Sequence, residues 1–350
     1  MKKIKLVGLS LVASLSLAAP AVLASVSAFD VAPAVVYAQE EGLTLRQGYV
    51  AAHGDQSFTS VVVLLKGDII VDVHLDEYQY MEGEGWTGVP NSDAGFGESY
   101  PEGMTLISKR ENSEGYSALM TDIAKSTVAY ADNLNAIEDA VKGKTLEEAQ
   151  ALVADLDALG EDGNVSDVVS GATLTDAGGY VNAIVEVANN GFEVAGAATE
   201  TAELEIKQSL AAPHGDKSFA LVTVALDGDV VVATSLDEFQ FVQGEDWTGV
   251  PNSDATFGEN YPEDSILVSK MIDSEGYSAM MTEKAGSTVA YADNMNAIIQ
   301  FATGKTVAEI EEGIAQLTEL GEEGNVADVV SGATLADAGG YLQAIVDTAK

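Results

Sequence analysis

A hydroxyl group that follows a glycine, just before a predicted helix, occurs twice in this chain. Residues 167–176 read D-V-V-S-G-A-T-L-T-D, and residues 328–337 read D-V-V-S-G-A-T-L-A-D. Glycine and alanine leave the closing threonine, Thr173 or Thr334, unobstructed and let the backbone approach a phosphate closely. The N-terminus of the next helix would favour that phosphate through its dipole and its free N–H groups. The pattern is therefore compatible with a phosphate-bearing ligand at each threonine.

A simpler role is open for the same residues. Asp176 lies three residues after Thr173, so the pair could be a capping box that only begins a helix. A capping box needs the threonine and the acid alone, whereas Asp167 and the small residues recur as well. Position 175 also differs between the runs, since Thr175 is replaced by Ala336. A hydroxyl is thus kept only at positions 173 and 334.

The run D-x-x-S-G-A-T resembles the flavinylation motif of the FMN-binding domain family. That family includes peripheral subunits of the Rnf and sodium-pumping NADH:quinone reductase complexes, and exported flavoproteins of Gram-positive extracellular electron transfer. Its motif threonine is bonded through the hydroxyl to the phosphate of FMN, and a flavin transferase recognises the motif. The resemblance implies that Thr173 and Thr334 carry FMN and that Asp167 and Asp328 assist recognition or attachment. The other motif residues implied to contact the cofactor are Ser170, Gly171, Ala172, Ser331, Gly332 and Ala333.

The composition restricts the redox chemistry that is open to the chain. It has no cysteine and three histidines, which excludes disulfides, thiolate-bound zinc, iron–sulfur clusters and c-type haem attachment. Any redox activity must therefore come from an organic cofactor. The formal charge of −40 repels phosphate backbones and anionic lipid, so we expect no nucleic-acid partner.

The first 38 residues are predicted to be a signal peptide. Lys2, Lys3 and Lys5 precede an apolar run, and small residues at Ala28 and Ala38 offer two cleavage sites. Cleavage after Ala38 is favoured because the chain turns polar at once. An uncleaved membrane anchor is the alternative. Outside the membrane a dissociating FMN would be lost by dilution, which a covalent bond prevents.

An internal repeat organises the rest of the chain. Residues 53–189 and 214–350 align without a gap at an offset of 161, with 84 identities in 137 positions. A period this long indicates two globular domains, each with its own core, rather than a solenoid. We predict FMN-binding domains at 42–190 and 203–350, joined by a linker at 191–202.

Within each copy the pattern predicts strands first and helices afterwards. In the first copy β-rich runs at 57–65 and 69–80 flank a hairpin turn, and an irregular stretch follows that contains W-T-G-V-P-N-S-D. A helix is expected from about 116 to 140. Thr145 with Glu148, and Thr306 with Glu309, predict capping boxes for the next helix. This order favours an α+β fold with a mostly antiparallel sheet.

An isoalloxazine ring needs apolar or aromatic walls and a few polar groups. The chain's two tryptophans lie in the irregular loops, which we expect to cover the flavins, and two tyrosines begin helices nearby. Ordinary packing is the alternative for all of them. Lys109 and Lys270 could stabilise a reduced, anionic flavin, or be ion-paired or solvated. The candidate pocket residues are Trp86, Asn91, Ser92, Tyr116, Trp247, Asn252, Ser253 and Tyr277.

These observations favour an exported electron carrier with two covalent FMN groups. It would accept electrons from a membrane-side donor of the quinone or NADH dehydrogenase type and pass them to an extracellular acceptor such as ferric iron. A flavin-dependent reductase of one organic substrate and a structural surface repeat are the alternatives. The sequence identifies no catalytic residue. Calcium binding at 155–160 is rejected because the fifth position of the run is leucine.

Overall fold

A computed structural model describes residues 42–350, apart from residues 99, 161–162, 202–203, 245 and 322–323. The described residues belong to one compact unit, Glu40–Lys350. The predicted signal peptide lies outside them. Within the described part, no helix has the length and apolar character that crossing a membrane requires.

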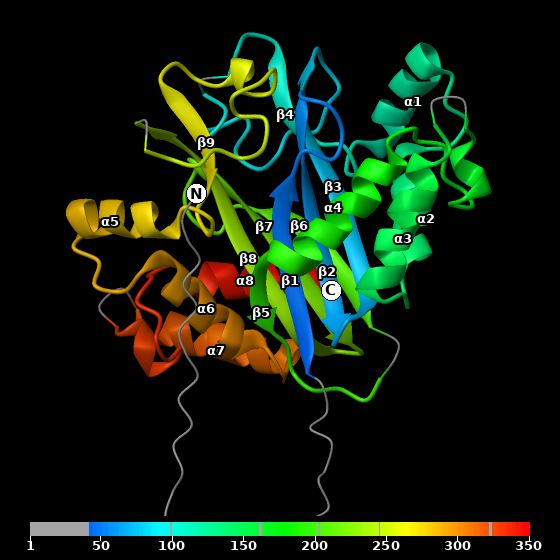
Figure 1. Ribbon diagram of the computed structural model, residues 1–350. Helices are drawn as coiled ribbons and strands as arrows, with labels where there is room; N and C mark the ends of the chain where they lie inside the picture. The colour runs from blue at the N-terminus through cyan, green and yellow to red at the C-terminus, as the bar shows by residue number, and fades with distance from the viewer. Residues whose placement is uncertain (1–41, 99, 161–162, 202–203, 245, 322–323) are drawn as a thin grey trace, which may run out of the picture. The chain divides into compact units, whose positions relative to one another are not determined.

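The strands form two antiparallel sheets, one from each copy, as the sequence predicts (Figure 1). The first has the order β4-β3-β2-β1-β5, and the second has the order β10-β8-β7-β6 with β9 paired to β8. The strands of the first sheet are β1 (Leu43–Val50), β2 (Ser57–Lys66), β3 (Ile69–Glu82), β4 (Met104–Ser108) and β5 (Phe192–Ala195). Those of the second are β6 (Glu205–Ala211), β7 (Ser218–Asp227), β8 (Val230–Gln243), β9 (Ser265–Ser269) and β10 (Lys305–Thr306).

Four α-helices follow the first four strands of each sheet in chain order, while β5 comes after α4 and β10 lies between α6 and α7. The first copy has α1 (Ser113–Ala124), α2 (Tyr130–Val141), α3 (Leu146–Asp157) and α4 (Ala177–Asn190). The second has α5 (Ser274–Ala285), α6 (Tyr291–Ala302), α7 (Val307–Leu320) and α8 (Ala338–Ala349). Single 3-10 turns occur at Val165–Asp167, Gly258–Asn260 and Val326–Asp328. Both predicted capping boxes, at Thr145 and Thr306, are confirmed.

The helices and sheets form four layers. Helix α4 packs on β1 and β2 and α2 packs on β3, while α8 and α6 cover the second sheet. On their other faces the two sheets contact each other, β1 against β8 and β3 against β6. In Figure 1, α4 lies in front of the first sheet and α8 behind the second. The contacts are reciprocal, so the two copies are arranged like the subunits of a two-fold dimer.

This layering explains why β2 is apolar along its whole length. Val61, Val63 and Leu65 belong to the core under the first copy's helices, whereas Val62 and Leu64 join the core of the second copy. A strand that is buried on both faces needs no alternation of polar and apolar residues. The prediction of two domains with separate cores is therefore not confirmed, because two of the three core clusters contain residues of both copies.

An aromatic cluster fills one end of the space between the sheets. Phe58 stacks on Tyr78 at 5.0 Å between ring centroids, and Phe219 stacks on Phe239 at 4.9 Å. Phe58 also contacts Phe239 of the other copy at 5.6 Å. All four rings are fully buried. Aromatic pairs of this kind add to the burial energy, so the junction is a hydrophobic core rather than a loose domain contact.

The segment predicted to be a linker contains a strand. Residues 192–195 form β5, which pairs with β1 from Phe192↔Gln47 to Ala195↔Thr44. After it, the N–H of Ala197 donates to the carbonyl of Val232 in the other copy. The small, polar composition suggested a flexible tether, but Phe192 and Val194 alternate with polar residues as an edge strand does.

The helix predicted over residues 116–140 is two helices. Helix α1 ends at Lys125, which has a left-handed backbone with φ of 58°, and α2 begins at Tyr130. Gly286 occupies the same position in the second copy with φ of 67°. Glycine is the usual residue at such a helix end, so comparing the copies would have revealed the break.

Candidate functional site

The D-V-V-S-G-A-T segment forms a tight loop after a single 3-10 turn. Gly171 and Gly332 both have φ of +93°, a conformation that residues other than glycine seldom adopt. Ala172 and Ala333 are fully buried, whereas the neighbouring threonines are exposed. The alanine therefore anchors the loop in the core, and the next residue is presented at the surface.

Each threonine is held by an asparagine of a neighbouring helix. The Oδ1 atom of Asn133, in α2, accepts hydrogen bonds from Thr173 N at 2.6 Å, Thr173 Oγ1 at 3.2 Å and Leu174 N at 3.2 Å. Asn294 holds the N–H and hydroxyl of Thr334 and the N–H of the next residue at the same three distances. The two loops are thus bonded identically, which their sequence identity required.

The capping-box alternative is wrong. Helix α4 begins at Ala177 with Asp176 as its N-cap, and no side chain accepts a capping hydrogen bond there. The hydroxyl of Thr173 bonds instead to α2, four residues before the helix begins. The carbonyl of Asp176 already accepts the N–H groups of Gly179 and Tyr180. The helix end is consequently farther from the threonine, and less free to bind a phosphate, than the sequence suggested.

The other polar residues of the motif lie at the surface. Asp167 and Ser170 are exposed, as are Asp328 and Ser331. Asp167 Oδ1 accepts a hydrogen bond from Asn164 at 3.3 Å, which fixes its orientation beside the loop. Their exposure leaves all four side chains accessible to another protein.

Helix α1 is joined to α2, the helix whose Asn133 bonds to the S-G-A-T loop. We name that loop, residues 170–173 and its counterpart 331–334, the attachment loop. The hydroxyls of Ser117 and Ser113 accept the N–H groups of Tyr130 and Ala131 at 2.8 and 3.0 Å. Tyr116 packs edge-on against Tyr130 at 5.0 Å between ring centroids. The serines of α1 therefore cap the first turn of α2. They also fix Tyr116 of α1 beside α2, the helix that holds Thr173.

The tryptophans pack against the first turn of these helices. A Cβ atom on Gly115 would lie 3.2 Å from the ring of Trp86, and one on Gly276 would lie 3.2 Å from the ring of Trp247. Tyr277 follows Gly276 in the second copy and contacts Tyr291 at 5.1 Å. The structure thus brings the predicted tryptophans and tyrosines together along α1 and α5.

Helix α1 has no buried residue although it carries several apolar side chains. Ile123 is 76% exposed, the highest value among the exposed large hydrophobic residues of the described chain. Leu119 and Met120 are half-buried. Helix α1 therefore presents an apolar face that the described residues leave partly open.

Asn91 and Asn252 have a structural role at the junction of the copies. Asn91 Nδ2 donates to the carbonyls of Gly215 and Ser218 at 3.0 and 2.7 Å, and Asn252 Nδ2 makes the same bonds to the first copy. Both asparagines have a left-handed backbone with φ of 65°. The amide hydrogens of both asparagines are thus bonded to the other copy and are not available to hydrogen-bond a flavin.

The neighbouring serines also lie inside their loops. Ser253 Oγ bonds to the carbonyl of Val250 at 2.6 Å and to the hydroxyl of Tyr261 at 2.7 Å. In the first copy a Cβ atom on Gly88 would lie 2.6 Å from the Cβ atom of Ser92. These contacts pack the side chains of Ser92 and Ser253 inside their own loops.

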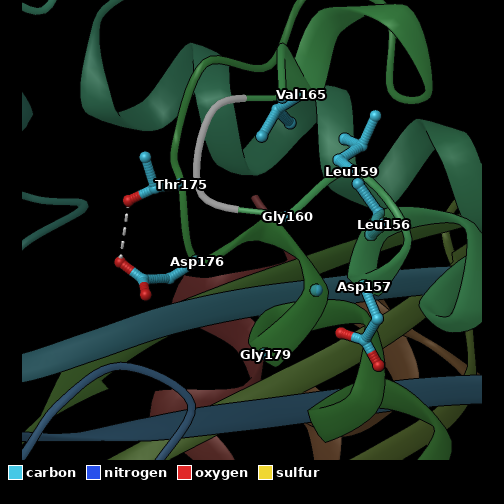
Figure 2. A pocket seen from close by; sticks show the side chains of 10 residues that line it. Leu156, Asp157, Leu159, Gly160, Val165, Thr175, Asp176 and Gly179 are labelled. Carbon is cyan, nitrogen blue, oxygen red and sulfur yellow. Dashed lines mark hydrogen bonds between the residues drawn. The ribbon is translucent and has the colours of Figure 1, made fainter.

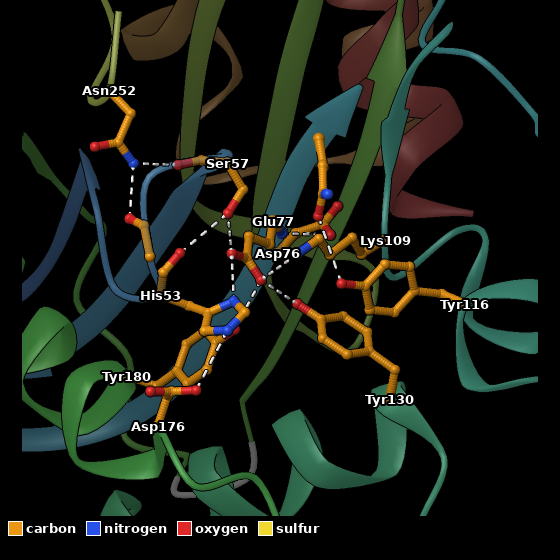
Figure 3. A network of polar contacts seen from close by, with 12 residues as sticks. His53, Ser57, Asp76, Glu77, Lys109, Tyr116, Tyr130, Asp176, Tyr180 and Asn252 are labelled. Atoms are coloured by element: carbon orange, nitrogen blue, oxygen red, sulfur yellow. Dashed lines mark hydrogen bonds and ion pairs between the residues drawn. The ribbon is translucent and has the colours of Figure 1, made fainter. Parts of the chain in front are cut away.

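A buried charged network lies beneath the loop of the first copy (Figure 3). Glu77 accepts hydrogen bonds from Tyr130 and Tyr180 at 2.8 and 2.7 Å, and its carboxylate is 3.0 Å from Lys109 Nζ. Ser57 also donates to it. Glu77 and Lys109 are almost completely buried, so the lysine is ion-paired and cannot be a solvated surface residue.

His53 links this network to the surface. Its Nδ1 lies 3.6 Å from Glu77, and its Nε2 lies 3.3 Å from Asp176 at the start of α4. The hydrogen bond to Glu77 raises the pKa of His53, against the effect of its burial. Burial alone would raise the pKa of Glu77, but the charge of Lys109 and the bonds from His53 and Ser57 hold it well below its usual range.

The second copy has a reduced version of the network. Lys270 Nζ lies 2.7 Å from Glu238, and Tyr291 donates to Glu238 at 3.4 Å. The hydroxyl of Tyr341, which corresponds to Tyr180, is buried without a hydrogen-bond partner among the described residues. The carboxylate of the second copy therefore has fewer donors around it.

A cleft of about 440 Å³ opens on the other side of the motif (Figure 2). Leu156 and Asp157 at the end of α3 form one wall, and Thr175 and Asp176 form the opposite one. The threonine that lines it is Thr175, whereas Thr173 bonds to α2. Thr173 is thus held on the side of α2 and does not line this cleft.

Searches of protein-family models, of curated proteins and of solved structures find no match to this chain.

Sequence reasoning missed Asn133, Asn294, Glu77 and Glu238. The signal for the asparagines is the run Y-A-D-N, which recurs at 130–133 and 291–294. A buried asparagine or glutamate inside an otherwise apolar element usually has a bonding role. Their positions, 40 and about 100 residues from the threonines, hid that role.

Proposed function

We propose that the protein is an exported electron carrier that holds two FMN groups, one esterified to Thr173 and one to Thr334. The observation that carries this proposal is the repeated presentation of one threonine. In both copies the threonine is an exposed residue, and the same three hydrogen bonds join its loop to an asparagine. The surrounding S-G-A-T residues are identical and resemble a known flavinylation motif.

The residues near the threonine fit a flavin. The half-exposed apolar side of α1, with Tyr116 and Met120, would cover the ring in the first copy, and α5 with Tyr277 would do so in the second. Trp86 and Trp247 support the first turns of these helices. Bound FMN would supply reversible uptake of one or two electrons, which no side chain of this cysteine-free protein offers at ordinary potentials.

The buried lysines would act on the cofactor through charge. Lys109 Nζ lies 4.8 Å from the ring centre of Tyr116, and Lys270 Nζ lies 4.7 Å from that of Tyr277. A cation behind the aromatic wall favours added negative charge in front of it, although its ion pair with glutamate reduces the effect. Burial lowers the pKa of Lys270, but Glu238 and Tyr277 outweigh this, so the pKa lies above its usual value and the lysine stays charged.

The physiological partners would be a flavin transferase, a membrane-side donor and an extracellular acceptor such as ferric iron. The formal charge of −40 would attract cationic or metal-containing partners and keep the protein from nucleic acid. The exposed acids and serines of the motif would contact the transferase.

Co-expression with a flavin transferase tests the proposal. The purified protein should be yellow, and the colour should stay with the chain in urea. Thr173→Ala and Thr334→Ala should each remove half of the flavin absorbance, and the double variant should be colourless. Thr175→Ala is the matched control, because Ala336 occupies that position in the second copy. A colourless wild type, or colour that washes off in urea, would refute covalent attachment.

A further inference from the structure

Asn133 is an asparagine whose hydrogen-bonding capacity is fully used. The side chain is 0% exposed. Its Oδ1 accepts from two backbone N–H groups and one hydroxyl at the attachment loop. Its Nδ2 donates to the carbonyls of Val128 and Ala129, in the link between α1 and α2, at 3.2 and 3.0 Å. Asn294 makes the same bonds in the second copy.

The bonds to Asn133 determine how the hydroxyl of Thr173 is oriented. A threonine hydroxyl has one proton and two lone pairs. Because the hydroxyl donates its proton to Asn133 Oδ1, both lone pairs of Oγ1 remain available to a reaction partner, and Thr173 is an exposed residue. The backbone N–H bonds to the same oxygen fix the loop, and Gly171 rests against Ala136 one turn further along α2, where an added Cβ would lie 3.4 Å away.

We propose that Asn133 and Asn294 are positioning residues for covalent flavin attachment, an inference that rests on the proposed function. Each would hold the threonine oxygen with its lone pairs toward the phosphorus of an incoming flavin dinucleotide. In the transfer, the Oγ–P bond forms and the P–O bond of the pyrophosphate breaks. AMP leaves with the pyrophosphate electrons, and the hydroxyl proton passes to a base of the transferase, so no redox partner is needed.

An amide oxygen accepts hydrogen bonds but is too weak a base to take the proton. The asparagine therefore acts by orientation alone, and the transferase must supply the base. Correct orientation of a reacting pair contributes strongly to rate, and an error of about 1 Å can cost roughly a hundredfold. Loss of the acceptor should slow attachment at the adjacent threonine and leave the other copy unaffected.

The test uses the whole chain, in which each copy is the internal control for the other. Purified protein without flavin is incubated with a flavin transferase, FAD and Mg²⁺, and the modification of Thr173 and Thr334 is followed separately by peptide mass. In Asn133→Leu, which keeps the branched shape and loses the acceptor, attachment at Thr173 should slow about 10- to 100-fold. Attachment at Thr334 should keep its wild-type rate, and Asn294→Leu should give the reverse.

Asn133→Asp separates positioning from folding. Aspartate keeps the acceptor toward Thr173 but turns its second oxygen toward the carbonyls of Val128 and Ala129. It should therefore lower the unfolding midpoint, yet modify Thr173 at least about tenfold faster than the leucine variant does. With the leucine variant, kcat at Thr173 should fall while KM stays near the wild-type value, because the exposed motif residues are intact. Asn135 is an exposed neighbour in α2, and Asn135→Ala should change neither kcat nor KM at Thr173.

The outcomes distinguish the two proposals. A wild type without any adduct refutes the proposed function itself. Two adducts in the wild type, with Thr173 modified at the normal rate in Asn133→Leu, overturn the positioning role alone. That role also fails if attachment follows stability, so that the aspartate variant is as slow as the leucine variant.

Discussion

The two copies are alike at the attachment loops and differ in the buried networks behind them. Thr173 and Thr334 make the same bonds to their asparagines at the same distances. Behind them, Glu77 has five polar partners, whereas Glu238 has a lysine, a serine and one long bond from a tyrosine. The two loops thus have the same geometry, whereas the buried glutamates behind them differ in the number of polar groups that contact them.

The divergence continues around the first network. Arg110 bonds to Glu138 in the first copy, and their counterparts in the second are Met271 and Ile299. Burial raises the pKa of Glu138 to about 7, against the opposing charge of Arg110. The difference teaches that two loops of the same geometry can lie in unequal electrostatic environments. Two flavins of equal linkage and unequal potential would suit a relay.

Removal of the buried lysines should have the largest effect on stability. Lys270→Met leaves Glu238 buried with few other donors and should lower the free energy of unfolding by about 3–5 kcal/mol. Lys109→Met should cost less, because Tyr130, Tyr180, Ser57 and His53 still contact Glu77. Denaturant unfolding of both variants measures the difference.

The matched controls pair each lysine change with loss of the charge it faces. Lys270→Met combined with Glu238→Gln should recover much of the lost stability, because no uncompensated charge remains. Equal losses for Lys109→Met and Lys270→Met would contradict the idea that the first network is better satisfied.

The loops that cross between the copies should show equal, intermediate effects. Asn91→Ala and Asn252→Ala each remove two bonds to carbonyls of the other copy, and each should cost about 1–3 kcal/mol. Asn182→Ala, on the exposed side of α4, is the control and should change stability little. Because two of the three core clusters contain residues of both copies, a single unfolding transition is expected for every variant. Two separate transitions would show that the copies fold independently.

The smallest effect concerns acid sensitivity that only the first copy has. Burial, with the charges of Arg110 and Lys142, lowers the pKa of His74 to about 3, and Ser235 occupies the equivalent position. Between that value and about 6.5 the unfolded chain binds a proton that the folded chain does not, so stability falls as the pH falls.

His74→Ser should remove this dependence and be more stable than the wild type by about 1 kcal/mol at pH 5 relative to pH 8. The expected free-energy difference is this small because His74 is only partly buried, so that solvent screens its charge. Unfolding midpoints at the two pH values, with Ser235→His as the reverse change, measure the effect. An unchanged difference between pH 5 and pH 8 would show that His74 titrates normally in the folded protein.

Features of local origin could be predicted from the sequence. The repeat, the β2–β3 hairpin, the capping boxes at Thr145 and Thr306 and the glycine of the attachment loop all depend on neighbouring residues. The break at Lys125 was also local, and Gly286 in the second copy signalled it.

Features that depend on distant residues could not be predicted. The packing of one sheet on the other joins residues about 180 apart, as in the contact between Phe58 and Phe239, and no spacing pattern encodes it. Asn133 lies 40 residues before the threonine it holds. The roles assigned to Asn91 and Ser92 followed from their polar type in a loop, whereas the structure commits them to the loop and to the other copy.

The intact mass of the purified protein tests covalent flavin attachment most directly. The chain secreted by cells that contain a flavin transferase should be heavier by two FMN phosphoesters, and peptide mapping should locate them at Thr173 and Thr334. An unmodified mass from such cells, or flavin bound at residues other than these two threonines, would contradict the account.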